Sequence, residues 1–231
     1  MRGGATLALG LVGVLAAAGA VRARGSRVIG DSDPVLGADL TRRLDDLALA
    51  YRGREGWIPY RNAEESKRFA REHGLTYLGA GTSRSVFAVP ARGFPMNSIA
   101  LKIGRVADNR AEARVWREAP AWMKALLVPV LGVATDGDWL AMERVRPVTP
   151  EAYAKMRDDL DSRRSRRLLL DCGVMDLGLL NTASDGRILD YAYLGNENQW
   201  RSCTENGEAA RVRAWTAGGS DPKLLRWVKN G

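Results

Sequence analysis

The sequence has little of the side chains on which most catalytic and metal sites depend. Among 231 residues there are one histidine, His73, and two cysteines, Cys172 and Cys203. No Cys-x-x-Cys or His-x₃-His spacing occurs, which argues against a structural zinc site. Two cysteines do not make the disulfide framework of a small secreted domain. His73 falls where a helix is predicted to end, so we do not expect it to act in catalysis.

Length and composition indicate a globular chain of one ordinary domain with additional segments. Hydrophobic residues make up 45% and charged residues 27% of the sequence, which excludes a disordered protein. The net charge of +8 is typical of a solvated basic surface, or of attraction to nucleotide phosphates, nucleic acid or anionic lipid. No nucleic-acid-binding motif accompanies the charge, so nucleic acid is not expected as a partner.

The beginning of the chain is an apolar segment, because residues 3–21 carry no charge. Arginines flank it, at Arg2 before it and at Arg22, Arg24 and Arg27 after it. The segment is just long enough to span a membrane, and the arginine excess on its C-terminal side favours a cytosolic location of the downstream chain. We therefore predict a membrane-anchored protein with a cytosolic C-terminal domain. Ala18-Gly19-Ala20 also matches a signal-peptidase site, which leaves a cleaved signal peptide open, and a cytoplasmic protein is the third alternative.

Periodicity and turn residues predict sheet and helix in separate parts of the chain. Helices are expected at residues 36–51, 62–73, 109–118 and 151–170, with two short ones at 208–215 and 222–228. Strands are expected at residues 76–78, 85–89, 98–103, 128–133 and 139–142. This arrangement predicts an α+β fold with a small antiparallel sheet.

The most informative motif is Asp176-x₄-Asn181, followed by a turn and an apolar pair that lead into Asp190. Phosphoryl-transfer sites use this spacing to hold a base and Mg²⁺ ligands on one hairpin. Carboxylate and amide oxygens are the hard ligands that Mg²⁺ binds. The alternative is an ordinary turn-rich hairpin in which Asp and Asn act as turn formers.

Upstream elements supply matching partners. The Gly79-x-Gly81 turn before Val86 allows a backbone to approach phosphates closely, although such turns also occur in ordinary hairpins. Lys102 lies on the next strand, on the face opposite the larger aliphatic residues. On the following helix Glu112 would orient this lysine by ion pairing.

The helix that carries Glu112 also carries Glu118, which competes with Glu112 for the pairing with the lysine. Further along the chain, the strand that ends at Glu143 and Val145 runs into a joint. Backbone groups at such a joint can hydrogen-bond a purine edge.

In this order the motifs resemble the protein-kinase-like superfamily, most closely the minimal kinase-like proteins of phages and prokaryotes. The resemblance rests on Gly79-x-Gly81-x₄-Val86, Ala100-x-Lys102, Glu112, Met142-Glu143, Asp176-x₄-Asn181 and Asp190-Tyr191. It implies a two-lobed protein-kinase-like fold with a small antiparallel-sheet N-lobe and a reduced, mostly helical C-lobe. The expected segments are 1–30 (apolar segment and linker), 31–74 (helical extension), 75–146 (N-lobe) and 147–231 (C-lobe).

The resemblance implies an ATP- and Mg²⁺-dependent phosphotransferase. Asp176 would be the catalytic base, and Lys102 would contact the α- and β-phosphates. The ATP-binding residues implied are Gly79, Gly81, Val86, Lys102, Glu112, Glu143 and Val145, and the Mg²⁺ ligands implied are Asn181 and Asp190. The phosphate acceptor, a protein or a small molecule, is not specified by the sequence.

Departures from the family pattern keep two alternatives open. Arg84 stands where a third glycine is usual, and Val174-Met175 stands where His-Arg usually precedes the catalytic Asp. Only about 40 residues follow Asp190, too few for a full activation segment. These features favour a pseudokinase that binds nucleotide as a regulatory or scaffold module. The second alternative is a basic membrane-associated protein that binds anions or nucleic acid through Arg163, Arg164, Arg166, Arg167, Arg211 and Arg213.

Overall fold

The computed structural model describes residues 26–27, 36–52 and 63–205. The predicted apolar segment at 3–21, the expected helix start at Asn62 and the two predicted helices after residue 206 lie outside these ranges. Within them, no helix has both the length and the apolar composition needed to cross a membrane. The membrane anchor therefore stays a prediction.

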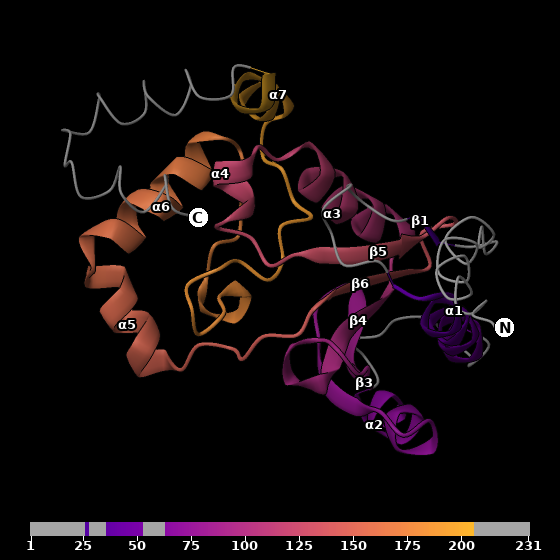
Figure 1. The fold of residues 1–231 in the computed structure, drawn as a ribbon. Helices are drawn as coiled ribbons and strands as arrows, with labels where there is room; N and C mark the ends of the chain where they lie inside the picture. Colours follow the sequence, from indigo (N-terminus) through magenta and orange to yellow (C-terminus); the bar gives the residue numbers. More distant parts are fainter. Residues whose placement is uncertain (1–25, 28–35, 53–62, 206–231) are drawn as a thin grey trace, which may run out of the picture.

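The centre of the fold is an antiparallel sheet in the strand order β1-β5-β6-β4-β3-β2 (Figure 1). The strands are β1 (Ser26–Arg27), β2 (Thr76–Ala80), β3 (Arg84–Pro90), β4 (Ser98–Gly104), β5 (Val130–Ala134) and β6 (Trp139–Glu143). The five longer strands confirm the predicted ones, and the two-residue β1 was not predicted. The mixed α+β class is thus confirmed.

One face of the sheet is covered by two N-terminal helices, α1 (Ala38–Arg52) and α2 (Ala63–Glu72). Leu44 and Phe69 from these helices join a buried cluster with the β4 aliphatics, of which Leu101 is an example. Every second residue of β4 faces this cluster, as the alternating sequence predicts. Residues 36–52 and 63–72 of the predicted extension therefore contribute to the same core as the sheet.

The opposite face is covered by α3 (Val106–Glu118), α4 (Ala121–Lys124) and the C-terminal part of the described chain. Leu140 of β6 packs there with Trp116 of α3. Tyr191 and Trp200, from later in the chain, lie in the same cluster and are almost fully buried. Side chains on this face of the sheet therefore meet both α3 and the segment that carries the Asp-x₄-Asn motif.

The single helix predicted at 151–170 is wrong, because the chain breaks it at Asp159. The structure has α5 (Pro150–Asp158) and α6 (Leu160–Asp171), with Asp159 in an extended conformation between them (φ −69°, ψ 131°). The Asp159 carboxylate accepts a hydrogen bond from the Ser162 N–H at 2.8 Å and caps α6. An aspartate that satisfies a free N–H at a helix start favours a new helix over continuation of the old one.

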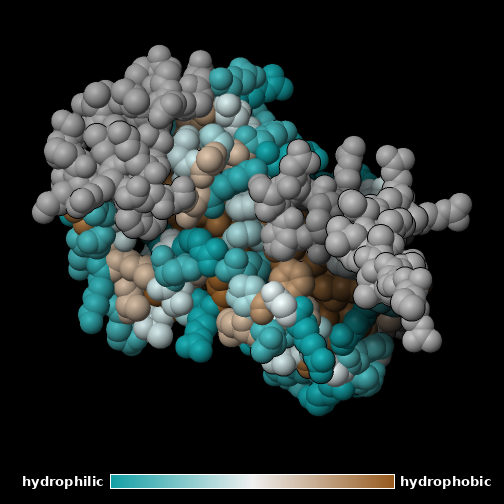
Figure 2. All heavy atoms as spheres, viewed as in Figure 1, coloured by the Kyte–Doolittle hydropathy of each residue, from teal (hydrophilic) through white to brown (hydrophobic). Residues whose placement is uncertain are grey.

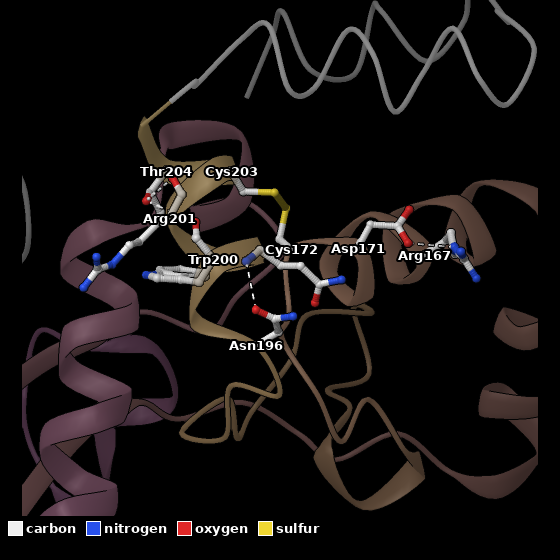
Figure 3. Close-up of a disulfide and its surroundings, with 9 residues drawn as sticks. Arg167, Asp171, Cys172, Asn196, Trp200, Arg201, Cys203 and Thr204 are labelled. Atoms are coloured by element: carbon white, nitrogen blue, oxygen red, sulfur yellow. Dashed lines mark hydrogen bonds and ion pairs between the residues drawn. A yellow bond between two sulfur atoms is a disulfide. The ribbon is translucent and has the colours of Figure 1, made fainter.

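A further helix, α7 (Glu197–Glu205), was not predicted and is joined covalently to the end of α6. Cys172 caps α6 and forms a disulfide with Cys203 of α7, with the Cα atoms 5.6 Å apart (Figure 3). The two cysteines thus form one bridge, although the sequence supports no larger framework. Disulfides are typical of oxidising compartments, whereas the sequence predicts a cytosolic domain. A bridge that stays oxidised in the cell would argue against the cytosolic location, and a reduced pair of thiols would agree with it.

The arginines of α6 do not form one open basic face. Arg166 donates to the Thr182 hydroxyl at 2.8 Å, and Arg167 pairs with an aspartate one turn later at 2.9 Å. Arg211 and Arg213 lie outside the described residues. Figure 2 shows hydrophilic side chains on much of α2 and α5, so polar surface is not confined to these arginines. Two of the four described arginines of the anion-binding alternative therefore have partners within the protein, although the Arg167 side chain is still 77% exposed.

Candidate nucleotide and metal site

Three of the predicted nucleotide contacts lie in one row across the sheet. Gly79 of β2 is opposite Val86 of β3, and Val86 is opposite Lys102 of β4. Directly opposed residues in antiparallel strands share a face of the sheet. Val86 and Lys102 are therefore on the face covered by α3, as is Leu140, which lies opposite Lys102 on β6.

Lys102 is buried and paired with Glu112 of α3. Its Nζ lies 2.8 Å from Glu112 Oε1 and 2.9 Å from Oε2, and it also donates to the Leu189 carbonyl oxygen at 2.8 Å. Lys102 is 6% exposed and Glu112 is fully buried, so this ion pair is shielded from water. Glu118, the competing residue, instead accepts a hydrogen bond from Trp200 Nε1. The contacts of Lys102 therefore join β4 both to α3, through Glu112, and to Leu189, the residue directly before Asp190.

The Gly-rich turn is held against the end of β4 by close backbone packing. Gly81 N–H donates to the Arg84 carbonyl at 2.9 Å, which closes the turn, and Arg105 N–H donates to the Ser83 carbonyl at 3.0 Å. A Cβ on Gly104 would lie 2.3 Å from the Ser83 carbonyl oxygen and 2.6 Å from the Arg84 Cα. Only glycine at position 104 allows the turn to approach this closely.

We expect Gly104→Ala to lower the free energy of unfolding by about 1–3 kcal/mol, because the new methyl group meets backbone atoms that must shift. The matched control is Gly81→Ala in the turn itself, where a Cβ would meet nothing within 4 Å. Urea unfolding of both variants measures the difference. Equal unfolding free energies for the two variants would contradict the close approach at Gly104.

Arg84 occupies the centre of the charged cluster, which the sequence did not predict. Its Nη1 donates to Glu112 Oε2 and its Nη2 to Asp190 Oδ1, both at 2.6 Å. The side chain is 5% exposed. Burial lowers the pKa of Arg84, but the charges of Glu112 and Asp190 outweigh burial and raise this pKa above its usual value. The only sign of this role in the sequence was that an arginine stands where the kinase-like pattern usually has a glycine.

Asp190 is held in its ionised form. Burial raises the pKa of its carboxyl, but the charges of Lys102 and Arg84, with hydrogen bonds from Arg84 and the Ala192 N–H, lower the pKa to about 2. Its side chain is still 41% exposed. The carboxylate is therefore negative at neutral pH and partly accessible from solvent.

The Asp-x₄-Asn motif and Asp190 are brought together by a short hairpin. The Leu189 N–H donates to the Asn181 carbonyl at 2.8 Å, so Asn181 lies across from the residue before Asp190. Asn181 ends a 3₁₀ turn, η3 (Leu179–Asn181), and its Nδ2 donates to the Asp176 carbonyl at 2.9 Å. That bond uses the amide nitrogen and leaves Oδ1 as an acceptor.

The donor set fits Mg²⁺ bound together with a nucleotide. Mg²⁺ is usually held by one or two carboxylates plus phosphates and waters, all through oxygen. The Asp190 carboxylate and the Asn181 Oδ1 supply such oxygens. Among the described residues, no three or more His, Cys, Asp or Glu side chains group as a metal site.

Asp176 is exposed and has an unusual backbone conformation. Its φ is 61°, in the left-handed region that residues other than glycine seldom adopt. Such strain clusters at functional sites. Tyr153 and Arg166 both donate to the carbonyl of the next residue, Leu177, and so hold the chain on the C-terminal side of Asp176.

One backbone group of the predicted purine-binding joint has a partner within the protein. The Glu143 N–H donates to the Pro129 carbonyl at 3.0 Å, so this group is already used. The Glu143 side chain pairs with Arg187 of the hairpin at 2.7 Å. The Val145 N–H has no backbone acceptor within the described part of the chain. The purine contact of this joint stays a prediction, in which the Glu143 N–H is already used.

The structure thus brings Lys102, Glu112 and Asp190 into one cluster and links Asp176 to Asn181 at its edge. Gly81 lies in the turn at the end of the same sheet. Sequence reasoning missed the central arginine and the Glu143–Arg187 pair. No protein-family model and no curated protein matches this chain. The interpretation of the site therefore rests on its residues and their geometry.

Proposed function

We propose that this protein is an ATP- and Mg²⁺-dependent phosphotransferase with a minimal protein-kinase-like, two-lobed fold. The observation that carries the proposal is the buried Lys102–Glu112 pair, which is joined through the Leu189 carbonyl to the segment of Asp190. Kinase sites need an oriented lysine beside a metal-binding aspartate. Here these groups come from parts of the chain that are far apart in sequence.

In this proposal each group has a defined task. Lys102 binds the α- and β-phosphates, while Asp190 and Asn181 hold Mg²⁺, which neutralises charge on the phosphates when bound. Asp176 accepts the proton of the attacking hydroxyl. The acceptor oxygen forms a bond to the γ-phosphorus, the bond from this phosphorus to the β–γ bridging oxygen breaks, and ADP leaves.

A pseudokinase is the second candidate, and a specific observation favours it. Lys102 Nζ already has three acceptors, two on Glu112 and one on Leu189, and an Asp190 oxygen is bound to Arg84. Nucleotide must therefore compete with internal partners. A membrane-anchored protein with its site in the cytosol belongs to the same proposal, because the apolar segment at 3–21 and the use of ATP both suggest it. The Cys172–Cys203 disulfide is the feature that opposes this location, since cytosolic proteins seldom keep one.

The test is transfer of the γ-phosphate from labelled ATP with Mg²⁺ by the full chain, alongside Asp176→Ala and Asp190→Ala. We expect Asp176→Ala to lower the rate about 10²–10⁴-fold, the range for loss of a general base, and Asp190→Ala to abolish transfer. The matched control is Asp185→Asn in the turn of the same hairpin, where the side chain contacts Arg187. Its rate is expected to stay near that of the wild type.

Nucleotide binding, measured as a thermal shift, distinguishes the phosphotransferase from the two alternatives. Mg-ATP binding without turnover or transfer to any acceptor tested would favour the pseudokinase. Absence of both binding and turnover would contradict the nucleotide site and leave the basic surface as the remaining interpretation. Turnover that persists in both alanine variants would contradict the roles given to the two aspartates.

A further inference from the structure

Arg84 is the first residue of β3, directly after the Gly-rich turn, and its side chain is directed inward. An arginine is seldom fully buried unless it is paired. This one is buried and contacts two carboxylates that come from different parts of the chain. Its position therefore links the sheet to α3 and to the segment after the hairpin.

The geometry of the guanidinium sets the relation between these carboxylates. Its two amino groups are fixed in one plane. Nη1 is 2.6 Å from Glu112 Oε2 and Nη2 is 2.6 Å from Asp190 Oδ1. The rigid guanidinium of Arg84 therefore fixes the orientation of the Asp190 carboxylate relative to Glu112. Glu112 is buried and is also paired with Lys102.

The other cation of the cluster, Lys102, has different partners in this structure. The three hydrogens of Lys102 Nζ have acceptors in the two Glu112 oxygens and the Leu189 carbonyl. Asp190 accepts from Arg84 through Oδ1, and a carboxylate with two oxygens keeps further acceptor sites. Arg84 thus holds one oxygen of the carboxylate, the Ala192 N–H also donates to this group, and the side chain stays 41% exposed.

We propose that Arg84 is a positioning residue that holds the Asp190 carboxylate in the orientation required by a divalent cation bound with nucleotide. This inference rests on the proposed function and extends it to a residue that the family pattern does not assign. Carboxylates that bind metals are themselves hydrogen-bonded, and loss of such a partner typically costs 10–100-fold in metal affinity or activity.

The experiment measures Mn²⁺ binding to the full chain in the presence of ADP, by electron paramagnetic resonance. The variants are Arg84→Gln and Arg84→Lys, because lysine keeps the charge beside Glu112 but cannot bridge two carboxylates with a planar fork. We expect both to weaken Mn²⁺ binding about 10–100-fold. Their affinity for ADP without metal is expected to stay close to that of the wild type, since Lys102 keeps its contacts with Glu112 and the Leu189 carbonyl.

Arg110→Gln on α3 is the matched control, because Arg110 is exposed and donates to the Asp136 carbonyl. It should bind Mn²⁺ and ADP like the wild type. If Arg84→Gln does not fold, Arg84→Lys carries the test, because it retains a buried cation.

The outcomes separate this inference from the proposed function. If Arg84 only stabilises the fold, its variants unfold more easily but the folded protein binds Mn²⁺ with wild-type affinity. That result overturns the inference and leaves the phosphotransferase standing. If the wild type binds neither ADP nor Mn²⁺ with ADP, the proposed function fails and the inference fails with it.

Discussion

Replacement of Glu112 by glutamine is expected to lower the free energy of unfolding by about 3–5 kcal/mol, the cost of removing one partner from a buried ion pair. Glu112 is fully buried and accepts from Arg84, Lys102 and the Tyr191 N–H. Without its charge, two buried cations lose a shared anion. Urea unfolding, with the transition followed by tryptophan fluorescence, measures the change.

Glu118→Gln is the matched control, because it makes the same substitution six residues later on α3. Glu118 is exposed and accepts from Trp200 Nε1, a bond that a glutamine oxygen can also accept. Its unfolding free energy should change by less than about 1 kcal/mol. A second check is the double variant Glu112→Gln with Lys102→Met, whose cost should be smaller than the sum of the single costs. Additive costs would show that these residues do not interact.

The second large effect concerns the disulfide between α6 and α7. Cys172 and Cys203 are 31 residues apart in sequence. For a loop of this length, the loss of chain entropy in the unfolded state stabilises the fold by about 3–4 kcal/mol. A reducing agent is therefore expected to lower the Tm of the full chain by roughly 6–16 °C.

The fold should survive reduction, because α7 is also attached to α3. Trp200 is almost fully buried and donates to Glu118, while Arg114 pairs with Glu197 (Figure 3 shows Trp200 beside the bridge). The control is the double variant Cys172→Ala, Cys203→Ala, whose Tm should be low and insensitive to the reducing agent. The pairing would be contradicted if the untreated folded protein had free thiols and its Tm did not change on addition of the reducing agent.

Local sequence predicted the regular elements well where one physical signal dominated. The alternation of aliphatic residues in β4 placed Ile99, Leu101 and Ile103 on one face and Lys102 on the other, because successive strand residues point to opposite faces. The prediction failed at Asp159, where the same residues support both continuation of a helix and the start of a new one. Capping of α6 by the aspartate decided between them.

The candidate site was predictable only in its separate parts. Asp176, Asn181 and Asp190 have a recognisable spacing within a few turns of the chain, and Lys102 and Glu112 lie on adjacent elements. Their meeting depends on contacts over long sequence separations, such as the one of 87 residues between Lys102 and Leu189. No local pattern contains that information.

The sequence by itself determined the α+β class, the strands and the face of Lys102, because local periodicity decides them. Only the tertiary structure decided that Arg84 joins Glu112 to Asp190 and that Cys172 pairs with Cys203. The physical reason is burial. Charges removed from water must find partners wherever the fold brings them, and for Arg84 the second partner is 106 residues away.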